Sequence, residues 1–253
     1  MTENVHRDKI NHALSLQQPP SIPAVFLSAT DSTNRVAAEL LNTRTPPFVV
    51  VAEHQTAGRG TKGRSFHSPK GGLYASYVFE IPVRRLLQTT PRAAVACAEA
   101  IAGFGKEPKI KWVNDLMLDG KKIGGILTES TVRGNHATVI VGVGLNLYFD
   151  QALPEALQAI AAPVWDEAER VRAQALFDSM TVWMQRMIEE GAPFTALYEN
   201  RSCVIGKTIE VCCDGVWTEA AASGIDAFGR LRVQTGAGEI LLNTEEIRLK
   251  RQI

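Results

Sequence analysis

Residues 55–72 mix glycines with cationic side chains, a composition that suits an anionic ligand. The segment carries Gly58, Gly60, Gly63, Gly71 and Gly72, interleaved with Arg59, Lys62, Arg64 and Lys70. Glycine lets the backbone approach a ligand closely and turn its N–H groups inward, and the cations add positive charge. The segment lacks the Gly-Lys-Ser/Thr sequence that opens the helix of a P-loop. Taken alone, it fits an anion site and a mobile solvated loop equally well.

Two further segments place charges beside short apolar runs. Residues 111–115 are Lys-Trp-Val-Asn-Asp, and residues 121–129 are Lys-Lys-Ile-Gly-Gly-Ile-Leu-Thr-Glu. Lys122 precedes Gly124, Gly125 and a predicted strand, so its ammonium could reach a ligand lying over the two glycines. The alternative is a surface hairpin with Lys121 and Lys122 exposed to solvent.

Length and charge narrow the class of protein. The chain has 253 residues, 45% of them apolar, with 27 Lys plus Arg against 27 Asp plus Glu. The apolar share excludes a largely disordered chain, and the length predicts one large domain or a large and a small one. A net charge of zero argues against binding nucleic acid or an anionic membrane through overall charge, although a local basic site remains compatible with it.

Targeting signals and metal motifs are not evident. No apolar run reaches the roughly 18 residues of a membrane helix, and the N-terminus lacks the apolar core of a secretory signal. We therefore expect a cytoplasmic protein that binds no membrane. No Cys-x-x-Cys pair occurs among Cys97, Cys203, Cys212 and Cys213. We expect buried, reduced thiols and assign no metal site.

The elements that would position these segments follow from apolar spacing. Strand-like runs cover residues 22–27, 48–52, 73–80, 110–113, 116–118, 123–131 and 136–146, and Asp119-Gly120 predicts a hairpin turn. A first helix is predicted after Asp31-Ser32-Thr33, where helical spacing of apolar residues begins. Further helices are predicted at 89–104, 168–188 and about 194–200. Short strands at 209–211, 216–222, 231–234 and 239–242 predict a small all-β module.

Five of the segments occur in an order that resembles the bacterial biotin protein ligase family, also called biotin–[acetyl-CoA-carboxylase] ligase. They are Asp31-Ser32-Thr33-Asn34, residues 55–60, Lys111-Trp112-Val113-Asn114-Asp115, residues 122–127 and Gly142-Val143-Gly144-Leu145-Asn146. The resemblance runs from about residue 22 to the C-terminus. Gly224-Ile225-Asp226, Gly229 and Leu231 also resemble the small C-terminal domain of that family.

The resemblance implies an α+β fold in three parts. A tail at 1–21 precedes a biotin/lipoate ligase-like catalytic domain at 22–202, a mixed, largely antiparallel sheet flanked by helices. A small SH3-like β-barrel follows at 203–253. Some relatives carry a DNA-binding domain before the catalytic part, and the leading 21 residues leave no room for one. We therefore expect no DNA binding. A homodimer and the identity of the carrier protein stay open.

The implied activity uses ATP, Mg²⁺ and biotin. Members of the family make biotinyl-5′-adenylate and pyrophosphate, then transfer biotin to one lysine of a biotin carboxyl carrier protein. Two anions, the biotin carboxylate and the α-phosphate, must meet, and fixed cations lower their repulsion. The rivals are a lipoate–protein ligase or octanoyltransferase, and a biotin-sensing protein without transfer activity.

Site residues carry over by position. Matches to the biotin site are Ser32, Thr33, Asn34, Gln55, Arg59, Gly60, Thr61, Lys122 and Gly125. Matches to the ATP or adenylate site are Arg59, Arg64, Lys111, Asn114 and Asn146. The catalytic assignment falls on Lys111, Asp115, Lys122 and Arg64. Helix capping is the alternative for Asp31 and Ser32, core packing is favoured for Trp112, and Trp165 could stack on adenine or simply pack.

Two residues lead to specific hypotheses. Thr61 stands where a cation is common in the family, and its neighbour Lys62 does not reproduce the fork of an arginine. We expect the adenylate to be held less tightly than in a relative with arginine there. Asp115 is expected to receive or orient the proton that the acceptor lysine must lose, because only about one free lysine in 2,500 is neutral at pH 7.

Overall fold

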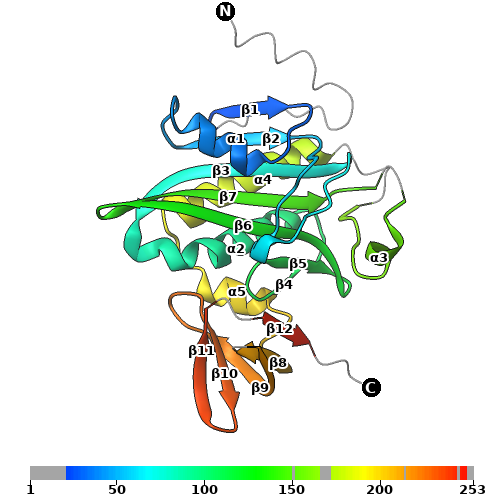
Figure 1. Ribbon diagram of the computed structural model, residues 1–253, viewed down its shortest axis with the longest axis vertical. Helices are drawn as coiled ribbons and strands as arrows, with labels where there is room; N and C mark the ends of the chain where they lie inside the picture. Colours follow the sequence, from blue (N-terminus) through cyan, green and yellow to red (C-terminus); the bar gives the residue numbers. More distant parts are fainter. Residues whose placement is uncertain (1–20, 150–151, 166–171, 214, 244–245, 250–253) are drawn as a thin grey trace, which may run out of the picture.

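The structure is a computed structural model that describes residues 21–149, 152–165, 172–213, 215–243 and 246–249. Apart from residue 21, the predicted N-terminal tail lies outside the described residues. Within them, the chain forms a seven-stranded sheet and a five-stranded sheet, drawn at the centre and at the bottom of Figure 1.

The larger sheet has the strand order β1-β2-β3-β7-β6-β5-β4. Its strands are β1 (Ala24–Leu27), β2 (Phe48–Ala52), β3 (Gly72–Pro82), β4 (Lys109–Lys111), β5 (Asp115–Leu118), β6 (Lys121–Arg133) and β7 (His136–Asn146). The β1–β2 pair is parallel and the other pairs are antiparallel, so the expected mixed, largely antiparallel sheet is confirmed.

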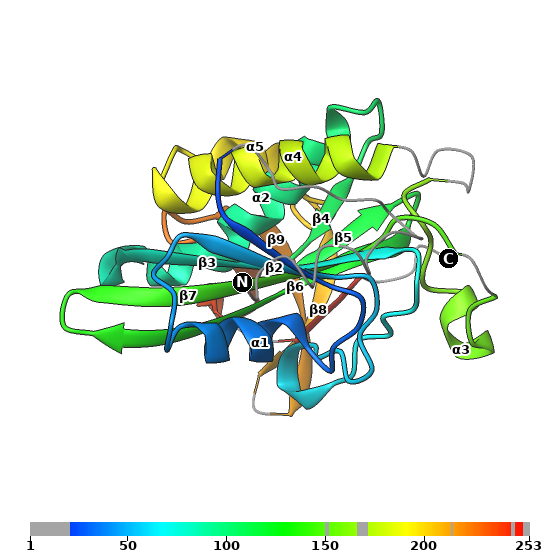
Figure 2. The ribbon, with the colours of Figure 1, turned by 90° about the horizontal axis from the view of Figure 1, so that it is seen from above.

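Helices cover both faces of this sheet, as the view from above shows (Figure 2). The helical elements are α1 (Thr33–Leu40), η3 (Val83–Gln88), α2 (Thr89–Ala102), α3 (Glu155–Gln158), α4 (Ala173–Met184), η5 (Gln185–Glu189) and α5 (Thr195–Arg201). Strand β2 shows why both faces need cover, because all of its residues are buried. Val49 and Val51 join the core under α2 and α4, and Phe48 and Val50 join a smaller core under α1.

The five-stranded sheet is the small SH3-like barrel at the C-terminal end. Its order is β11-β10-β9-β8-β12, formed by β8 (Thr208–Cys213), β9 (Val216–Ile225), β10 (Leu231–Thr235), β11 (Gly238–Leu242) and β12 (Glu246–Leu249). All neighbouring pairs are antiparallel. The boundary that we propose at residues 202 and 203 falls in the connection between α5 and β8.

The structure corrects several expected elements. The helix predicted at 168–188 is α4 followed by a π-helical turn, η5, and part of the prediction falls outside the described residues. Strand β12 and the short helix α3 were not predicted. The cysteines are free thiols, but only Cys97 is buried and the other three are half-buried. Burial raises the pKa of the Cys97 thiol.

No helix within the described residues is both long and apolar enough to cross a membrane.

Candidate active site

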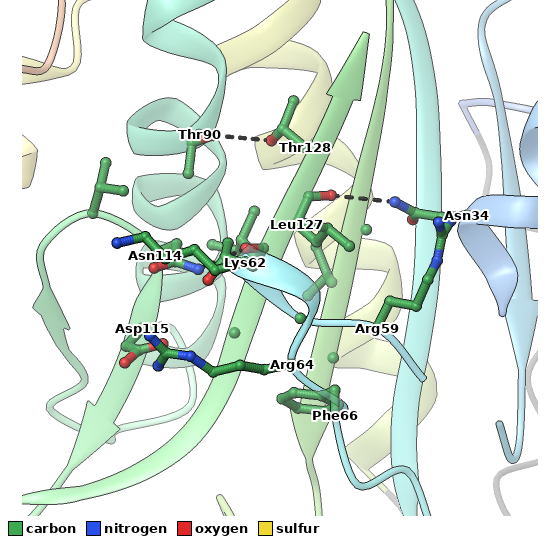
Figure 3. Close-up of a pocket in the computed structure, with 18 of the residues that line it drawn as sticks. Asn34, Arg59, Lys62, Arg64, Phe66, Thr90, Asn114, Asp115, Leu127 and Thr128 are labelled. Carbon is green, nitrogen blue, oxygen red and sulfur yellow. Dashed lines mark hydrogen bonds between the residues drawn. The ribbon is translucent and has the colours of Figure 1, made fainter. Parts of the chain in front are cut away.

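One cavity of about 510 Å³ lies over the larger sheet, beneath the glycine- and cation-rich segment 55–72, which we call the Gly/Arg loop (Figure 3). With one exception, it brings together every predicted site residue. The lining includes Ser32, Thr33, Asn34, Gln55, Arg59, Gly60, Thr61, Arg64, Lys111, Asn114, Asp115, Lys122 and Gly125. Asn146 is the exception. These residues come from four separated segments, so the fold assembles in space what the sequence spreads over about 90 positions.

Glycines in β6 and β7 form the floor of the cavity. A β-carbon on Gly142 would lie 2.2 Å from Asn34 Oδ1, and one on Gly144 would lie 2.5 Å from the Phe66 ring. Both are closer than real β-carbon contacts, so any larger residue would push these side chains away. Glycine is therefore needed here because helix α1 and the loop lie directly on the strands.

Neutral polar side chains form one end of the cavity, and we call Ser32, Thr33, Asn34 and Gln55 the neutral end. Gln55 Oε1 accepts from Thr33 N at 2.8 Å and from Thr33 Oγ1 at 3.1 Å. Gln55 Nε2 donates to Ser68 Oγ at 3.0 Å. These bonds lock the Gln55 amide against the start of α1.

Ser32 occupies the N-cap position of α1 without making a side-chain capping bond. The capping alternative is therefore not borne out for its hydroxyl, which borders the cavity. Asp31 instead accepts from Ser32 N at 2.6 Å and pairs with Arg35. The hydrogen bond from Arg35 lowers the pKa of Asp31 to about 2 from its usual 3.8.

The Asn34 carboxamide is held by three protein groups. Its Nδ2 donates to Glu129 Oε2 at 2.7 Å and to Leu127 O at 3.4 Å, and its Oδ1 accepts from Ser76 Oγ at 2.6 Å. The side chain is only 3% exposed. In this geometry Asn34 connects α1 to strands β3 and β6.

Charged side chains form the opposite end, and we call Lys62, Arg64, Lys111 and Lys122, with Asp115, the cationic end. Asp115 is the only carboxylate among the described residues that line the cavity. Its Oδ1 lies 2.5 Å from Lys122 Nζ, which also lies 5.9 Å from the centre of the Phe66 ring. Lys111 and Asp115 face each other across the β4–β5 pair. The surplus of positive charge suits an anionic ligand.

The Gly/Arg loop is tied together at its base. Gly60 N donates to Arg64 O at 2.7 Å, and Arg59 pairs with Ser65 through an isolated β-bridge. A single 3₁₀ turn, η2 (Thr61–Gly63), forms the tip. The two arginines diverge from the base: Arg59 reaches toward Asn34, and Arg64 points toward Asp115 (Figure 3). The loop therefore sends one arginine toward each end of the cavity, and the charge of Arg59 is paired with Glu129 Oε2 at 3.1 Å.

Two residues considered for nucleotide binding lie off the cavity wall. Asn146 Nδ2 donates to Ala162 O at 3.3 Å. Trp165 is 2% exposed and packs edge-on against Phe104, with ring centres 5.7 Å apart. Of the two alternatives for Trp165, the structure shows packing.

Trp112 joins the larger sheet to the barrel. It is 5% exposed, as the favoured core assignment predicted, and its Nε1 donates to Gly229 O at 3.1 Å. A β-carbon on Gly229 would lie 2.4 Å from Pro91 at the start of α2.

The same loop between β9 and β10 contains Asp226. Burial opposes ionisation of Asp226, but hydrogen bonds from Arg230 and backbone amides outweigh it and hold its pKa below the usual range. The loop between β9 and β10 thereby supports residues 111–115.

Sequence reasoning missed several residues of the site. Phe66, Thr90, Thr128 and Ile247 line the cavity, and Ser76 and Glu129 bind residues that do. A glycine inside a strand often marks a close approach of another segment, so Gly142 and Gly144 could have indicated that a side chain lies on β7. Ile247 comes from β12 and carried no comparable signal.

Comparisons with known proteins show which family the chain belongs to. The "Bifunctional ligase/repressor BirA" of Bacillus spizizenii is 30% identical over 238 residues, covering 89% of this chain and 73% of that protein. A sequence model of the "Biotin/lipoate A/B protein ligase family" matches residues 26–146. The chain belongs to this family.

Two further relatives extend the likeness within the family. A "Biotin--[acetyl-CoA-carboxylase] ligase" of Paracoccus denitrificans is 28% identical, covering 88% of this chain and 98% of that protein. The structure of a biotin protein ligase from Aquifex aeolicus in complex with biotin and ATP has a TM-score of 0.72 at 22% identity, covering 90% of this chain and 99% of that one. This last likeness concerns the fold alone.

Proposed function

We propose that this chain is a biotin protein ligase. It activates biotin with ATP to give biotinyl-5′-adenylate and pyrophosphate, then transfers biotin to a lysine of the biotin carboxyl carrier protein of acetyl-CoA carboxylase. The names of the relatives from Bacillus and Paracoccus support this activity. We place the reaction in the cytoplasm, where ATP is available.

The single observation that carries the proposal is the separation of charge within one cavity. The neutral end offers hydroxyl and amide groups, which suit the uncharged urea ring of biotin because that ring both donates and accepts hydrogen bonds. The cationic end offers fixed positive charges for a carboxylate and a triphosphate. A ligand with a neutral polar head and a carboxylate tail fits this arrangement from end to end.

In the first step a biotin carboxylate oxygen attacks the α-phosphorus of ATP. The bond between the α-phosphorus and the bridging oxygen breaks, and pyrophosphate leaves with the electron pair. We assign Lys122 to the biotin carboxylate and Arg64 and Lys111 to the phosphates. Each charge-assisted hydrogen bond contributes about 1.5–3 kcal/mol. Two or three such hydrogen bonds that strengthen in the transition state would raise the rate by several powers of ten, because about 1.4 kcal/mol corresponds to a tenfold change in rate.

Mg²⁺ fits the cationic end only in part. The described residues contain no group of three or more His, Cys, Asp or Glu side chains that could hold a metal ion. Mg²⁺ commonly keeps several waters and binds one or two carboxylates together with substrate phosphates. Asp115 would supply one protein oxygen, and nucleotide phosphates would supply others. When bound there, the ion would neutralise charge on the phosphates.

In the second step the acceptor lysine attacks the acyl carbon of the adenylate, and AMP leaves. The amine must lose a proton, and we assign Asp115 to receive or orient it. The distance of 2.5 Å between Asp115 Oδ1 and Lys122 Nζ supports this assignment, because Lys122 is the residue that we assign to the biotin carboxylate. Lys122 would thus contact the acyl phosphate while its partner Asp115 faces the attacking amine.

Labelled substrates test the proposal directly. The protein is incubated with radiolabelled biotin, ATP, Mg²⁺ and a carrier domain, and parallel reactions replace biotin with lipoate. Label on the carrier lysine, with release of pyrophosphate, is the expected result. Turnover with lipoate alone would assign the chain to the lipoate branch, and biotin binding without pyrophosphate release would indicate a sensor. Either of those results would overturn the proposal.

A further inference from the structure

Glu129 has no part in the roles assigned above, yet it meets both the neutral end and the loop. It lies on β6, opposite Ile140 of β7, with its side chain 39% exposed. One oxygen, Oε2, accepts from Asn34 Nδ2 at 2.7 Å and from Arg59 Nη2 at 3.1 Å. A single carboxylate therefore holds a residue of α1 and a residue of the loop against the sheet.

The chemistry of a carboxylate fixes the orientation of the Asn34 amide. An ionised carboxylate can only accept hydrogen bonds, so it requires Nδ2 on its own side. Leu127 O, at 3.4 Å from Nδ2, requires the same orientation. The carbonyl oxygen Oδ1 must then face Ser76, whose hydroxyl donates to it at 2.6 Å. If the amide turned over, Oδ1 would face the carboxylate and both contacts would become repulsive.

Ser76 connects the Asn34 amide to Thr33, which lines the cavity. Its hydroxyl also donates toward Thr33 Oγ1 at 2.7 Å, and it has one proton for the two acceptors. The orientation of Asn34 therefore decides how that proton is shared. Thr33 Oγ1 in turn donates to Gln55 Oε1, and Gln55 Nε2 donates to Ser68 Oγ. The hydrogen bonding of the Thr33 hydroxyl is thus set from Glu129, whereas the Gln55 amide is also held by Thr33 N at 2.8 Å.

We propose that Glu129 is a positioning residue that makes the cavity selective for a ligand with a urea ring over one with a plain acyl chain. The inference rests on the proposed function, because it takes the neutral end as the site of the ring. A site built to hydrogen-bond its substrate rejects an analogue that leaves the site's buried groups unpaired. The rejection weakens when those groups are free to reorient.

The test compares Glu129→Ala and Glu129→Gln in the full chain, with Glu239→Ala as the matched control. Glu239 also pairs with an arginine, Arg232, but it lies on the barrel. Pyrophosphate release is measured against biotin and against lipoate. For Glu129→Ala we expect the KM for biotin to rise about tenfold, the worth of one hydrogen bond to a charged group. The kcat should change less than about twofold, because Glu129 does not line the cavity.

Selectivity separates positioning from a merely structural role. Lipoate has no urea ring, so its kcat/KM should fall much less than that of biotin, and the preference for biotin should drop about tenfold. The Glu129→Gln variant keeps an acceptor oxygen and should lie between wild type and Glu129→Ala. An unchanged KM for biotin would overturn the proposal, as would an equal loss for both substrates. Where lipoate turns over too slowly to measure, the KM and kcat for biotin decide alone.

A second variant reaches Asn34 without touching Glu129. The β-carbon of Gly142→Ala would lie 2.2 Å from Asn34 Oδ1, so the amide must move while the carboxylate stays. We expect the same loss of preference for biotin, and a preserved preference in folded protein would contradict the inference. The wild-type protein distinguishes a failure of the proposed function from a failure of the role proposed for Glu129. If it forms no biotinyl adenylate, the proposed function fails; if it does and the Glu129 variants match it, only the positioning role fails.

Discussion

The two ends of the cavity are built in opposite ways. At the neutral end, Thr33, Asn34 and Gln55 are held by hydrogen bonds to one another and to buried neighbours, and Ser32 and Thr33 are each no more than 5% exposed. At the cationic end, the Lys122 side chain is 36% exposed. The neutral end is organised before a ligand arrives, whereas the loop cations stand on a segment with a single 3₁₀ turn.

The difference follows from what each end must do. Neutral dipoles recognise a ring only if their directions are fixed, because a wrongly turned donor leaves a buried group unpaired, which costs more than a correct hydrogen bond contributes. Charges act over longer distances and with looser geometry. The cationic end must also release pyrophosphate and admit an acceptor lysine, so it needs to open. We expect binding to depend on the first end and chemistry on the second.

The largest effect is expected for Lys122→Met. Removing this ammonium takes away the contact that we assign to the biotin carboxylate and leaves Asp115 without its partner at 2.5 Å. Biotin-dependent exchange of pyrophosphate into ATP should fall by about two to three orders of magnitude. The control is Lys121→Met, since Lys121 is exposed and bonds Gln158 O. Equal activities for the two variants would remove Lys122 from the reaction.

The next effect separates the two chemical steps. Asp115→Asn keeps the shape of the side chain but lowers its ability to take up a proton, so transfer from preformed adenylate should slow about ten- to a hundredfold. A single-turnover assay with carrier domain measures this rate. Asp119→Asn, in the hairpin turn where φ is 49°, is the matched control because asparagine tolerates that conformation. A transfer rate equal to wild type would refute the assignment of Asp115.

A smaller effect, in the opposite direction, is expected for Thr61→Arg. Thr61 stands at the tip of the loop and lines the cavity without adding charge. An arginine there would add a donor to the adenylate phosphate, so release of biotinyl-5′-adenylate should slow several-fold. The release is followed by trapping labelled adenylate in excess unlabelled biotin and ATP. An unchanged release rate would show that threonine at position 61 does not weaken the binding of the adenylate.

The smallest effect is expected for the stability of the fold when Asp31, next to Ser32 of the neutral end, is replaced by asparagine. The pKa of Asp31 is lowered to about 2, so its ionised form stabilises the fold above about pH 4, and this contribution is lost as pH falls toward 2. Asp31→Asn should therefore lower the Tm slightly at pH 6 and match wild type near pH 2. Because the side chain is 40% exposed, the difference is expected to be small. A Tm difference that persists unchanged at pH 2 would show that the charge is not responsible.

Much of the secondary structure could be predicted from local sequence patterns. Strand β2 is a continuous apolar run, and β7 alternates apolar residues with glycines, so both bounds were predicted as the structure has them. Strand β12 was missed because it is short and pairs with β8, more than 30 residues away. The helix predicted at 168–188 changes from α-helical to π-helical after Met184, at η5, a change that periodicity does not reveal.

The site was predictable where residue types alone suggest chemistry. The glycines and cations of the loop carry such a signal, and so does Lys122 before two glycines. Ser76 and Glu129 do not, because their importance comes from contacts across strands and with α1. Asn146 differs from both, because its place in a motif suggested the nucleotide, its amide donates to Ala162 O, and its assignment stays a prediction. Motif position alone does not give the direction of a side chain.

A structure of the protein with biotin and a non-hydrolysable ATP analogue would show directly which end of the cavity holds which part of biotin. We expect the urea ring within hydrogen-bond distance of Ser32, Thr33 or Gln55, with the carboxylate at Lys122 and the triphosphate beside Arg64 and Lys111. A ring bound among the cations, or a carboxylate bound at the neutral end, would contradict it.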